Sequence, residues 1–147
     1  MSLTPFLRRA VLAAGLLALP GAARPAGAQA VSAADVAQIR SVITRQLGAL
    51  QRDNAKAAFL LASPQLRAEF KTPQAYMRDA RTAHAPLFRH SGASFRALWI
   101  LDGEVVQQVA LTDDTGALWS VYYPMRRQAD GHWRIERPRL VASAVAI

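Results

Sequence analysis

From residue 32 onward, hydrophobic positions recur three or four residues apart. This spacing predicts an amphipathic helix that extends to about Arg52. The start of the helix has a hydroxyl at Ser32 and a carboxylate at Asp35, which resembles a capping box. The periodic positions are Val36, Ile39, Ile43, Leu47 and Leu50.

Three pairs of residues, each with a polar side chain that can cap a helix, predict the starts of further helices. Asp53-Asn54 interrupts the first helix and can cap a second one. Ser63-Pro64 and Thr72-Pro73 each place a hydroxyl before a proline, the combination that favours a helix start. We therefore expect a short helical turn over Gln65–Phe70 and a longer helix over Gln74–His84.

The hydrophobic period changes to two near Leu87, directly after Ala85-Pro86, where the proline ends the helical pattern. In the first predicted strand, every second residue is apolar, and the residues between them form a second set. The apolar residues are Phe95, Ala97, Trp99 and Leu101, and the second set is Arg96, Leu98 and Ile100. This alternation predicts that the two sets lie on opposite faces of the sheet.

Short turns separate the predicted strands. They lie at Asp102-Gly103, 113–116 and 129–131, and short connections predict antiparallel neighbours. The last strand is expected over His132–Val141. Pro138 is expected at an edge or a bulge, because proline cannot donate a ladder hydrogen bond.

This order of elements predicts an α+β fold with N-terminal helices packed on a curved antiparallel sheet. We expect one such domain over residues 31–147. Trp99, Trp119 and Trp133 fall one per strand and are placed to share a core.

Residues Met1–Ala30 have the three-part pattern of a secretory signal peptide. Arg8 and Arg9 precede the apolar run Ala10–Leu19, and Ala28-Gln29-Ala30 supplies small residues at the end. The run is too short to span a bilayer, which takes roughly 20 apolar residues. We therefore expect a soluble periplasmic or secreted protein with no stable membrane anchor after cleavage.

The charge balance is basic, with 18 Lys and Arg against 10 Asp and Glu in 147 residues. Without the three arginines of residues 1–30, 15 basic residues face 10 acidic ones. The excess favours anionic surroundings. The chain has no cysteine, which excludes a thiol enzyme and a lipidated cysteine.

Five segments of the sequence resemble a family of exported bacterial proteins, DUF4864, a domain of unknown function. The resemblance covers roughly Val36–Val141. The order of helices and strands is also similar to that of nuclear transport factor 2 and ketosteroid isomerase, which implies a cone with a pocket between sheet and helices. The family implies no catalytic residues. The segments are 39–47, 57–64, 72–76, 106–109 and 128–135.

Our first hypothesis is a non-enzymatic module that holds a small, partly apolar molecule in the cone, or a protein partner on the open sheet face. A homodimer through the sheet face is a further expectation. We do not expect nucleic acid as a partner or any cofactor. The residues predicted to line the pocket are Trp99, Gln107, Trp119, Tyr123 and Met125.

The alternative is an isomerase- or hydrolase-like enzyme that uses a buried carboxylate in the cone. Glu69, Asp79 and Tyr76 lie on the helical side, and Tyr122 and Tyr123 lie on a strand. No bound metal is expected, because the histidines fall in separate elements. They are His84, His90 and His132.

Five arginines lie on the last two predicted strands. If these strands pair, the guanidinium groups gather at one end of the sheet and could bind an anion. They would equally serve as a charged edge that prevents aggregation. The residues are Arg126, Arg127, Arg134, Arg137 and Arg139.

Overall fold

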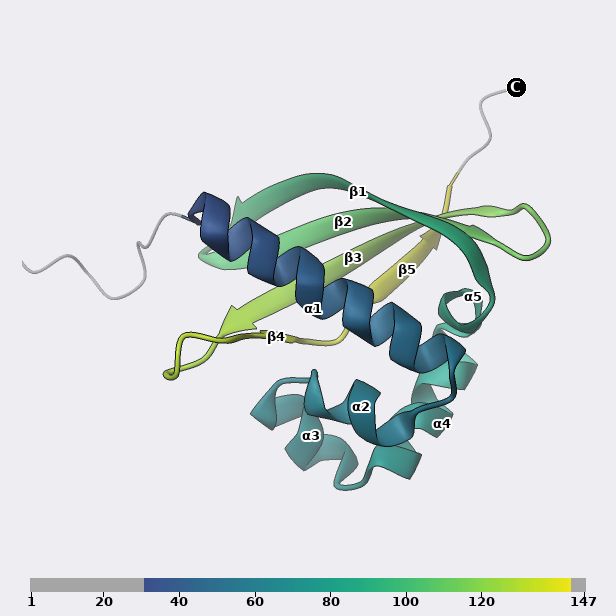
Figure 1. Ribbon diagram of the computed structural model, residues 1–147, viewed down its shortest axis with the longest axis horizontal. Helices are drawn as coiled ribbons and strands as arrows, with labels where there is room; N and C mark the ends of the chain where they lie inside the picture. Colours follow the sequence, from purple (N-terminus) through teal and green to yellow (C-terminus); the bar gives the residue numbers. More distant parts are fainter. Residues whose placement is uncertain (1–30, 144–147) are drawn as a thin grey trace, which may run out of the picture.

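The computed structural model describes residues 31–143, so the predicted signal peptide, Met1–Ala30, lies outside the described residues. Helices come first and an antiparallel sheet follows, which confirms the predicted α+β fold (Figure 1). The helices are α1 (Ala33–Gln51), α2 (Ala55–Leu60), α3 (Pro64–Phe70), α4 (Pro73–Ala83) and α5 (Ala85–Phe88). The strands are β1 (His90–Leu101), β2 (Glu104–Asp113), β3 (Leu118–Arg127), β4 (Trp133–Ile135) and β5 (Arg139–Ala142).

The predicted caps start the helices. At α1, Ser32 Oγ accepts from the Asp35 amide at 3.1 Å, and the Asp35 carboxylate accepts from the Ser32 amide at 2.9 Å. The side chains of Asn54, Ser63 and Thr72 cap α2, α3 and α4 in the same manner. These contacts satisfy amides that have no partner within the helix.

Between α4 and β1 the structure corrects the prediction. The chain forms α5 over Ala85–Phe88, so strand structure begins at His90 and not at Leu87. Pro86 is compatible with a helix here because it lies in the first turn, where the amide has no helical partner. Leu87 is 1% exposed and belongs to the core.

The sheet has the order β1-β2-β3-β4, and β5 also pairs with β3. The Asp102-Gly103 turn joins β1 to β2 with positive φ at both residues, as predicted. The predicted single strand His132–Val141 is wrong, because it breaks into β4 and β5 at residues 136–138. Pro138 has no amide for a ladder, and its carbonyl instead accepts from His84 Nε2 at 3.0 Å.

A bulge in β1 changes which side chains face the helices. Phe95 pairs with Val109, but Leu98 pairs with Gln107, so β1 has one extra residue between these pairs. The prediction that Trp99 lies on the same face as Phe95 is therefore wrong. Leu101 follows Trp99 onto the outer face, while Leu98 and Ile100 lie on the inner face. The sequence pattern has no feature that marks this extra residue.

The core lies between the inner face of the sheet and the helices, with α1 crossing the curved sheet (Figure 1). The indoles of Trp119 and Trp133 lie on this side, but Trp99 lies on the outer face and is 37% exposed. The predicted shared core of three tryptophans is therefore wrong. Residues with 0% exposure in this core include Ile39, Ile43, Val121, Tyr123 and Ile135.

No helix within residues 31–143 is long and apolar enough to cross a membrane.

Candidate functional site

The interior of the cone is filled by the protein's own side chains. Tyr123 and Gln107 are 0% exposed and Met125 is 3% exposed, so three of the predicted pocket residues are core residues. A void of about 10 Å³ lies between α1, α3, α4 and residues 137–138. That volume is roughly enough for one water molecule.

Gln107 has a structural contact of its own. Its Nε2 donates to the backbone carbonyls of Arg96 at 3.0 Å and Ala97 at 3.3 Å, the two residues at the β1 bulge. A bulge disrupts the ladder and leaves backbone groups without a strand partner. Gln107 therefore holds the bulge and, through it, the position of Trp99.

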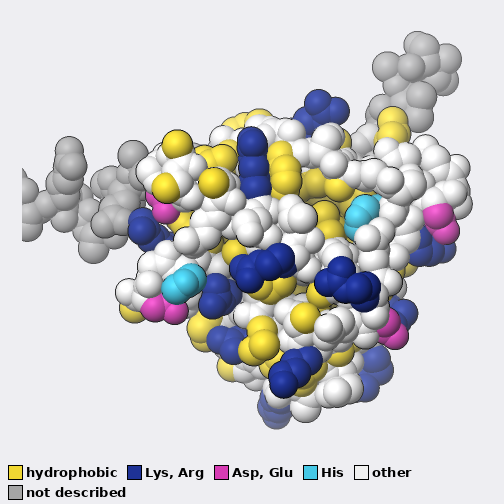
Figure 2. Space-filling model, viewed as in Figure 1, with side chains coloured by type: hydrophobic (Ala, Val, Ile, Leu, Met, Phe, Trp, Pro, Cys, Tyr) yellow, Lys and Arg dark blue, Asp and Glu magenta, His cyan; other side chains and the backbone are white. Residues whose placement is uncertain are grey.

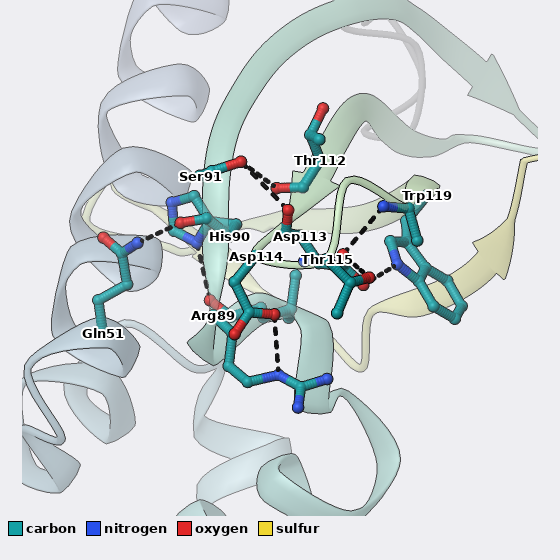
Figure 3. A network of polar contacts seen from close by, with 11 residues as sticks. Gln51, Arg89, His90, Ser91, Thr112, Asp113, Asp114, Thr115 and Trp119 are labelled. Carbon is teal, nitrogen blue, oxygen red and sulfur yellow. Dashed lines mark hydrogen bonds and ion pairs between the residues drawn. The ribbon is translucent and has the colours of Figure 1, made fainter.

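Trp119 is bound to a buried carboxylate at the other end of the sheet (Figure 3). Its Nε1 donates to Asp113 Oδ2 at 3.0 Å, and Asp113 also accepts from Thr115 and from the Ala117 amide. The Thr115 hydroxyl and then the Trp119 indole lower the pKa of Asp113 to about 2. Asp113 is thus an ionised anchor for the turn between β2 and β3.

Asp35 has the same role at the start of α1. Its carboxylate accepts from Ser32 and, at 3.0 Å, from the indole Nε1 of Trp133. The Ser32 amide and then the Trp133 indole lower its pKa to about 2. Among the described residues, the buried carboxylates are Asp35 and Asp113, and neither has the raised pKa that the enzymatic alternative requires.

The other groups named for that alternative do not assemble into an acid–base pair. Glu69 and Asp79 both bind Arg137, with oxygen–nitrogen distances of 2.5 and 3.2 Å. Tyr76 is buried, and its hydroxyl accepts from Gln46 Nε2 at 3.1 Å. Burial raises the pKa of Tyr76 and of Tyr123, so both phenols stay neutral at ordinary pH.

A groove of about 450 Å³ lies on the outer face of the sheet, on the side away from α1. Trp99 and Tyr122 stack along it, with ring centroids 5.9 Å apart and planes 27° apart. Val106, 2% exposed, pairs with Trp99 and forms the floor. Leu101 and Val141 are 55% and 52% exposed at its margins.

Arg139 contributes the one charge in the lining of this groove. It pairs with Tyr122 across β3 and β5, and its side chain is exposed. Within residues 31–143 it forms no ion pair. An aromatic and aliphatic groove therefore ends at an available guanidinium group.

Arg139 also lines a second cleft, of about 430 Å³, with Arg126 and Arg137. Three glutamates lie among these arginines, so this cleft is mixed in charge. Two of the cations are paired: Arg126 with Glu136 at 2.8 Å, and Arg137 with Glu69. The predicted arginine cluster is therefore brought together only in part.

The remaining two arginines of the predicted cluster lie outside this cleft. Arg127 Nη1 lies 3.6 Å from Asp35 Oδ1, near the start of α1. Arg134 pairs with Arg126 across β3 and β4, and its guanidinium donates to the Trp133 carbonyl at 2.9 Å. Because neighbouring side chains of a strand point to opposite faces of the sheet, Arg127 and Arg126 lie on different faces.

A sequence model described as "Domain of unknown function (DUF4864)" matches residues 32–145. This chain belongs to the DUF4864 family. The match spans all the helices and strands of the described structure, and so includes both faces of the sheet. No curated protein and no solved structure matches the chain. The predicted likeness to nuclear transport factor 2 stays a prediction.

In this DUF4864 protein, the sequence analysis missed three groove residues, and it named a fourth, Tyr122, only for the enzymatic alternative. The signal available was a period of two, in Trp99-x-Leu101 and in Arg139-x-Val141, but the bulge hides which face these pairs occupy. Trp99 and Arg139 were each predicted as site residues, for separate sites. The missed residues are Leu101, Val106 and Val141.

Two of the three histidines contact backbone carbonyls, and the third contacts an aspartate of its own turn. His84 contacts the Pro138 carbonyl, His90 Nδ1 lies 2.8 Å from the Leu87 carbonyl, and His132 lies next to Asp130. Within residues 31–143, no group of three or more His, Asp or Glu is arranged to hold a metal ion.

The helix-covered side of the DUF4864 protein presents a different surface. Figure 2 shows this side, where Lys and Arg side chains lie between small apolar patches over the helices. Arg40 and Arg45 are exposed on α1, and the Arg40 guanidinium lies over the Phe95 ring at 5.3 Å. These cations are dispersed and line no cleft with the groove residues.

Proposed function

We propose that this DUF4864 protein is an exported, non-enzymatic binding module whose ligand lies in the groove on the outer face of the sheet. The ligand is a small amphiphile with an apolar, planar or aliphatic body and an anionic head. The observation that carries the proposal is the stacked pair Trp99 and Tyr122 ending at Arg139, which has no ion pair within residues 31–143.

The apolar part of the groove favours a hydrophobic body. Its volume of about 450 Å³ falls in the range of roughly 300–1,000 Å³ that small-molecule sites occupy. Leu101 and Val141 are more than half exposed, and a bound apolar group would remove their surface from water. The face of an aromatic ring also stacks favourably on a planar ligand.

The charged end favours an anionic head. A guanidinium group donates two parallel hydrogen bonds to a carboxylate, phosphate or sulfonate. A ligand bound in the groove would cover the apolar surface beside Arg139, and the exclusion of water there would strengthen such a contact. Arg126 and Arg137 are already paired with glutamates, which leaves Arg139 as the available partner in the cleft lining.

Two fluorescent probes test this proposal. The first, 8-anilino-1-naphthalenesulfonate, has an aromatic body and an anionic head, and the second, N-phenyl-1-naphthylamine, lacks the anion. Trp99→Ala is expected to weaken both probes, because it removes the stacking surface. Arg139→Gln is expected to weaken the first probe roughly tenfold and to leave the second unchanged.

Matched control variants lie away from the groove. Leu60→Ala removes an exposed apolar side chain on α2, and Arg134→Gln removes a cation on β4; neither residue lines the groove. Both controls are expected to bind both probes like the wild type. If Trp99→Ala and Leu60→Ala bind the probes equally, the groove is not the binding site and the proposal fails.

Export is part of this proposal, and it is supported by the signal-peptide pattern of Met1–Ala30. Expression of the full chain in a bacterial host, followed by cell fractionation and intact mass measurement, tests it. The expected product is periplasmic and begins at Val31. A cytoplasmic product that retains residues 1–30 would contradict export without affecting the groove.

A further inference from the structure

β1 is an edge strand whose last part, beyond the bulge, is apolar and exposed. In the sheet, β1 pairs with β2 alone, so its other edge carries no strand within residues 31–143. Trp99, Ile100 and Leu101 are 37%, 54% and 55% exposed. Edge strands are usually blunted by charge, proline or short length, and Leu98–Leu101 contains neither a charge nor a proline.

The segment has opposite charges at its two ends. Arg96 precedes the apolar run, and Asp102 follows it directly in the turn. Neither side chain forms an ion pair within residues 31–143. In an antiparallel pair of two identical strands, the basic end of one copy lies beside the acidic end of the other.

We propose that β1 pairs with β1 of a second copy of this chain, antiparallel and about a two-fold axis near Trp99. In this register, Leu98 of each copy lies opposite Ile100 of the other, and Arg96 lies beside Asp102. Two identical apolar segments with opposite charges at their ends are complementary to themselves in this orientation. The interface is therefore isologous and closes as a dimer.

The bulge sets the limit of the pairing. The Arg96 and Ala97 carbonyls already accept from Gln107 Nε2, so the regular intermolecular ladder covers Leu98–Ile100, and the bulge of each copy lies opposite Leu101 and Asp102 of the other. The dimer extends the sheet across the axis. The outer faces of both copies then form one continuous surface, with the two Trp99 side chains next to the axis.

This inference does not rest on the proposed ligand groove. Ile100 lies on the inner face, opposite Val105, and does not line the groove. A substitution at Ile100 therefore separates pairing from ligand binding. Loss of the dimer with retained probe binding would leave the proposed function intact, and the reverse result would leave the dimer intact.

Sedimentation velocity of the full chain, expressed with its own N-terminal segment, tests the oligomeric state. The wild type is expected to be a dimer at concentrations on the order of 100 µM. Ile100→Lys is expected to weaken the dimer at least about tenfold, because it places a charge in the apolar run. Leu60→Lys, at an equally exposed site on α2, is expected to have no effect.

Charge exchange tests the orientation. In the homodimer, residue 96 of each copy lies beside residue 102 of the other, so there are two such pairs. Arg96→Glu makes both pairs acidic and Asp102→Lys makes both pairs basic, so each variant alone is expected to be monomeric. An equal mixture of the two restores both attractive pairs and is expected to form a heterodimer. Far-ultraviolet circular dichroism confirms that each variant folds.

Three results would overturn the inference. The first is a monomeric wild type at the highest concentration. The second is a dimer that Ile100→Lys leaves intact, since that dimer uses another surface. The third is a mixture of Arg96→Glu and Asp102→Lys that stays monomeric while the wild type dimerises, since β1 then does not pair in the antiparallel register.

Discussion

The two faces of one sheet differ although the same strands build both. Tyr122 and Tyr123 are neighbours on β3, yet Tyr123 is 0% exposed beneath the helices and Tyr122 forms one wall of an open groove. Both faces carry aromatic and aliphatic side chains. The difference is coverage: α1 crosses the inner face, and no helix of the described structure covers the outer one (Figure 1).

This comparison indicates where a ligand can bind. On the inner face, the indoles of Trp119 and Trp133 bind Asp113 and Asp35, and the tightly packed interior leaves little space. On the outer face, Trp99 keeps an exposed aromatic surface. The apolar surface available to a ligand is therefore on the face that the helices do not cover.

The largest expected effect separates Tyr123 from Tyr122. Tyr123→Ala is expected to lower the free energy of unfolding by about 3–5 kcal/mol, because it leaves a cavity in the core. Tyr122→Ala removes an outer-face ring and its stacking on Trp99, and is expected to cost about 1 kcal/mol. Urea denaturation measures both values.

A third substitution is the control for the tyrosine pair. Tyr123→Phe keeps the ring and removes a buried hydroxyl that has no hydrogen-bond partner, so stability is expected to stay the same or to rise. Equal losses for Tyr122→Ala and Tyr123→Ala would contradict the distinction between a covered and an open face.

A smaller effect is expected at Gln107. Gln107→Leu removes the donor that binds the Arg96 and Ala97 carbonyls, and is expected to cost about 1 kcal/mol. It is also expected to weaken probe binding in the groove, although Gln107 does not line it, because the bulge sets the position of Trp99.

The neighbouring glutamine provides the comparison. Gln108 Nε2 has one contact of 3.3 Å with Ser120 Oγ, on the outer face. Gln108→Leu is expected to change stability by less than about 0.5 kcal/mol. Probe titration and urea denaturation of both variants check this prediction, and equal behaviour of the two would show that the bulge does not depend on Gln107.

A further prediction concerns the stability of the fold in acid. Asp35 and Asp113 have pKa values of about 2 in the folded protein, against 3.8 for an ordinary aspartate. The unfolded chain therefore binds more protons in this range, so stability is lost as the pH falls from about 3.8 through 2. Urea midpoints across this range measure the loss.

A non-titrating variant assigns the acid effect to a residue. Asp113→Asn is expected to lower the urea midpoint at neutral pH and to make its fall with acid less steep. An equally steep fall in Asp113→Asn would show that other groups cause the acid sensitivity.

Helices α1 to α4 and the Asp102 turn were predictable because their signals are local. A hydroxyl or amide caps the starts of α1 to α4, at Ser32, Asn54, Ser63 and Thr72, and the Asp102 turn has the positive φ that its sequence favours. These features depend on atoms within a few residues, so the sequence determines them almost directly.

The site was predicted less well because its position depends on the register in which β1 pairs with β2. The bulge adds one residue to β1 without changing the alternation of Phe95, Ala97 and Trp99 in the sequence. What fixes it is the distant side chain of Gln107. One extra residue moved Trp99 from the predicted cone to the opposite face.

We expect ligands to bind the outer face of the sheet and not the interior of the cone. The chain has three tryptophans, whose indole N–H groups give separate peaks in a proton–nitrogen correlation spectrum. During titration with 8-anilino-1-naphthalenesulfonate, the Trp99 peak is predicted to shift while the Trp119 and Trp133 peaks stay in place. A stationary Trp99 peak, with shifts at Trp119 or Trp133, would contradict the account.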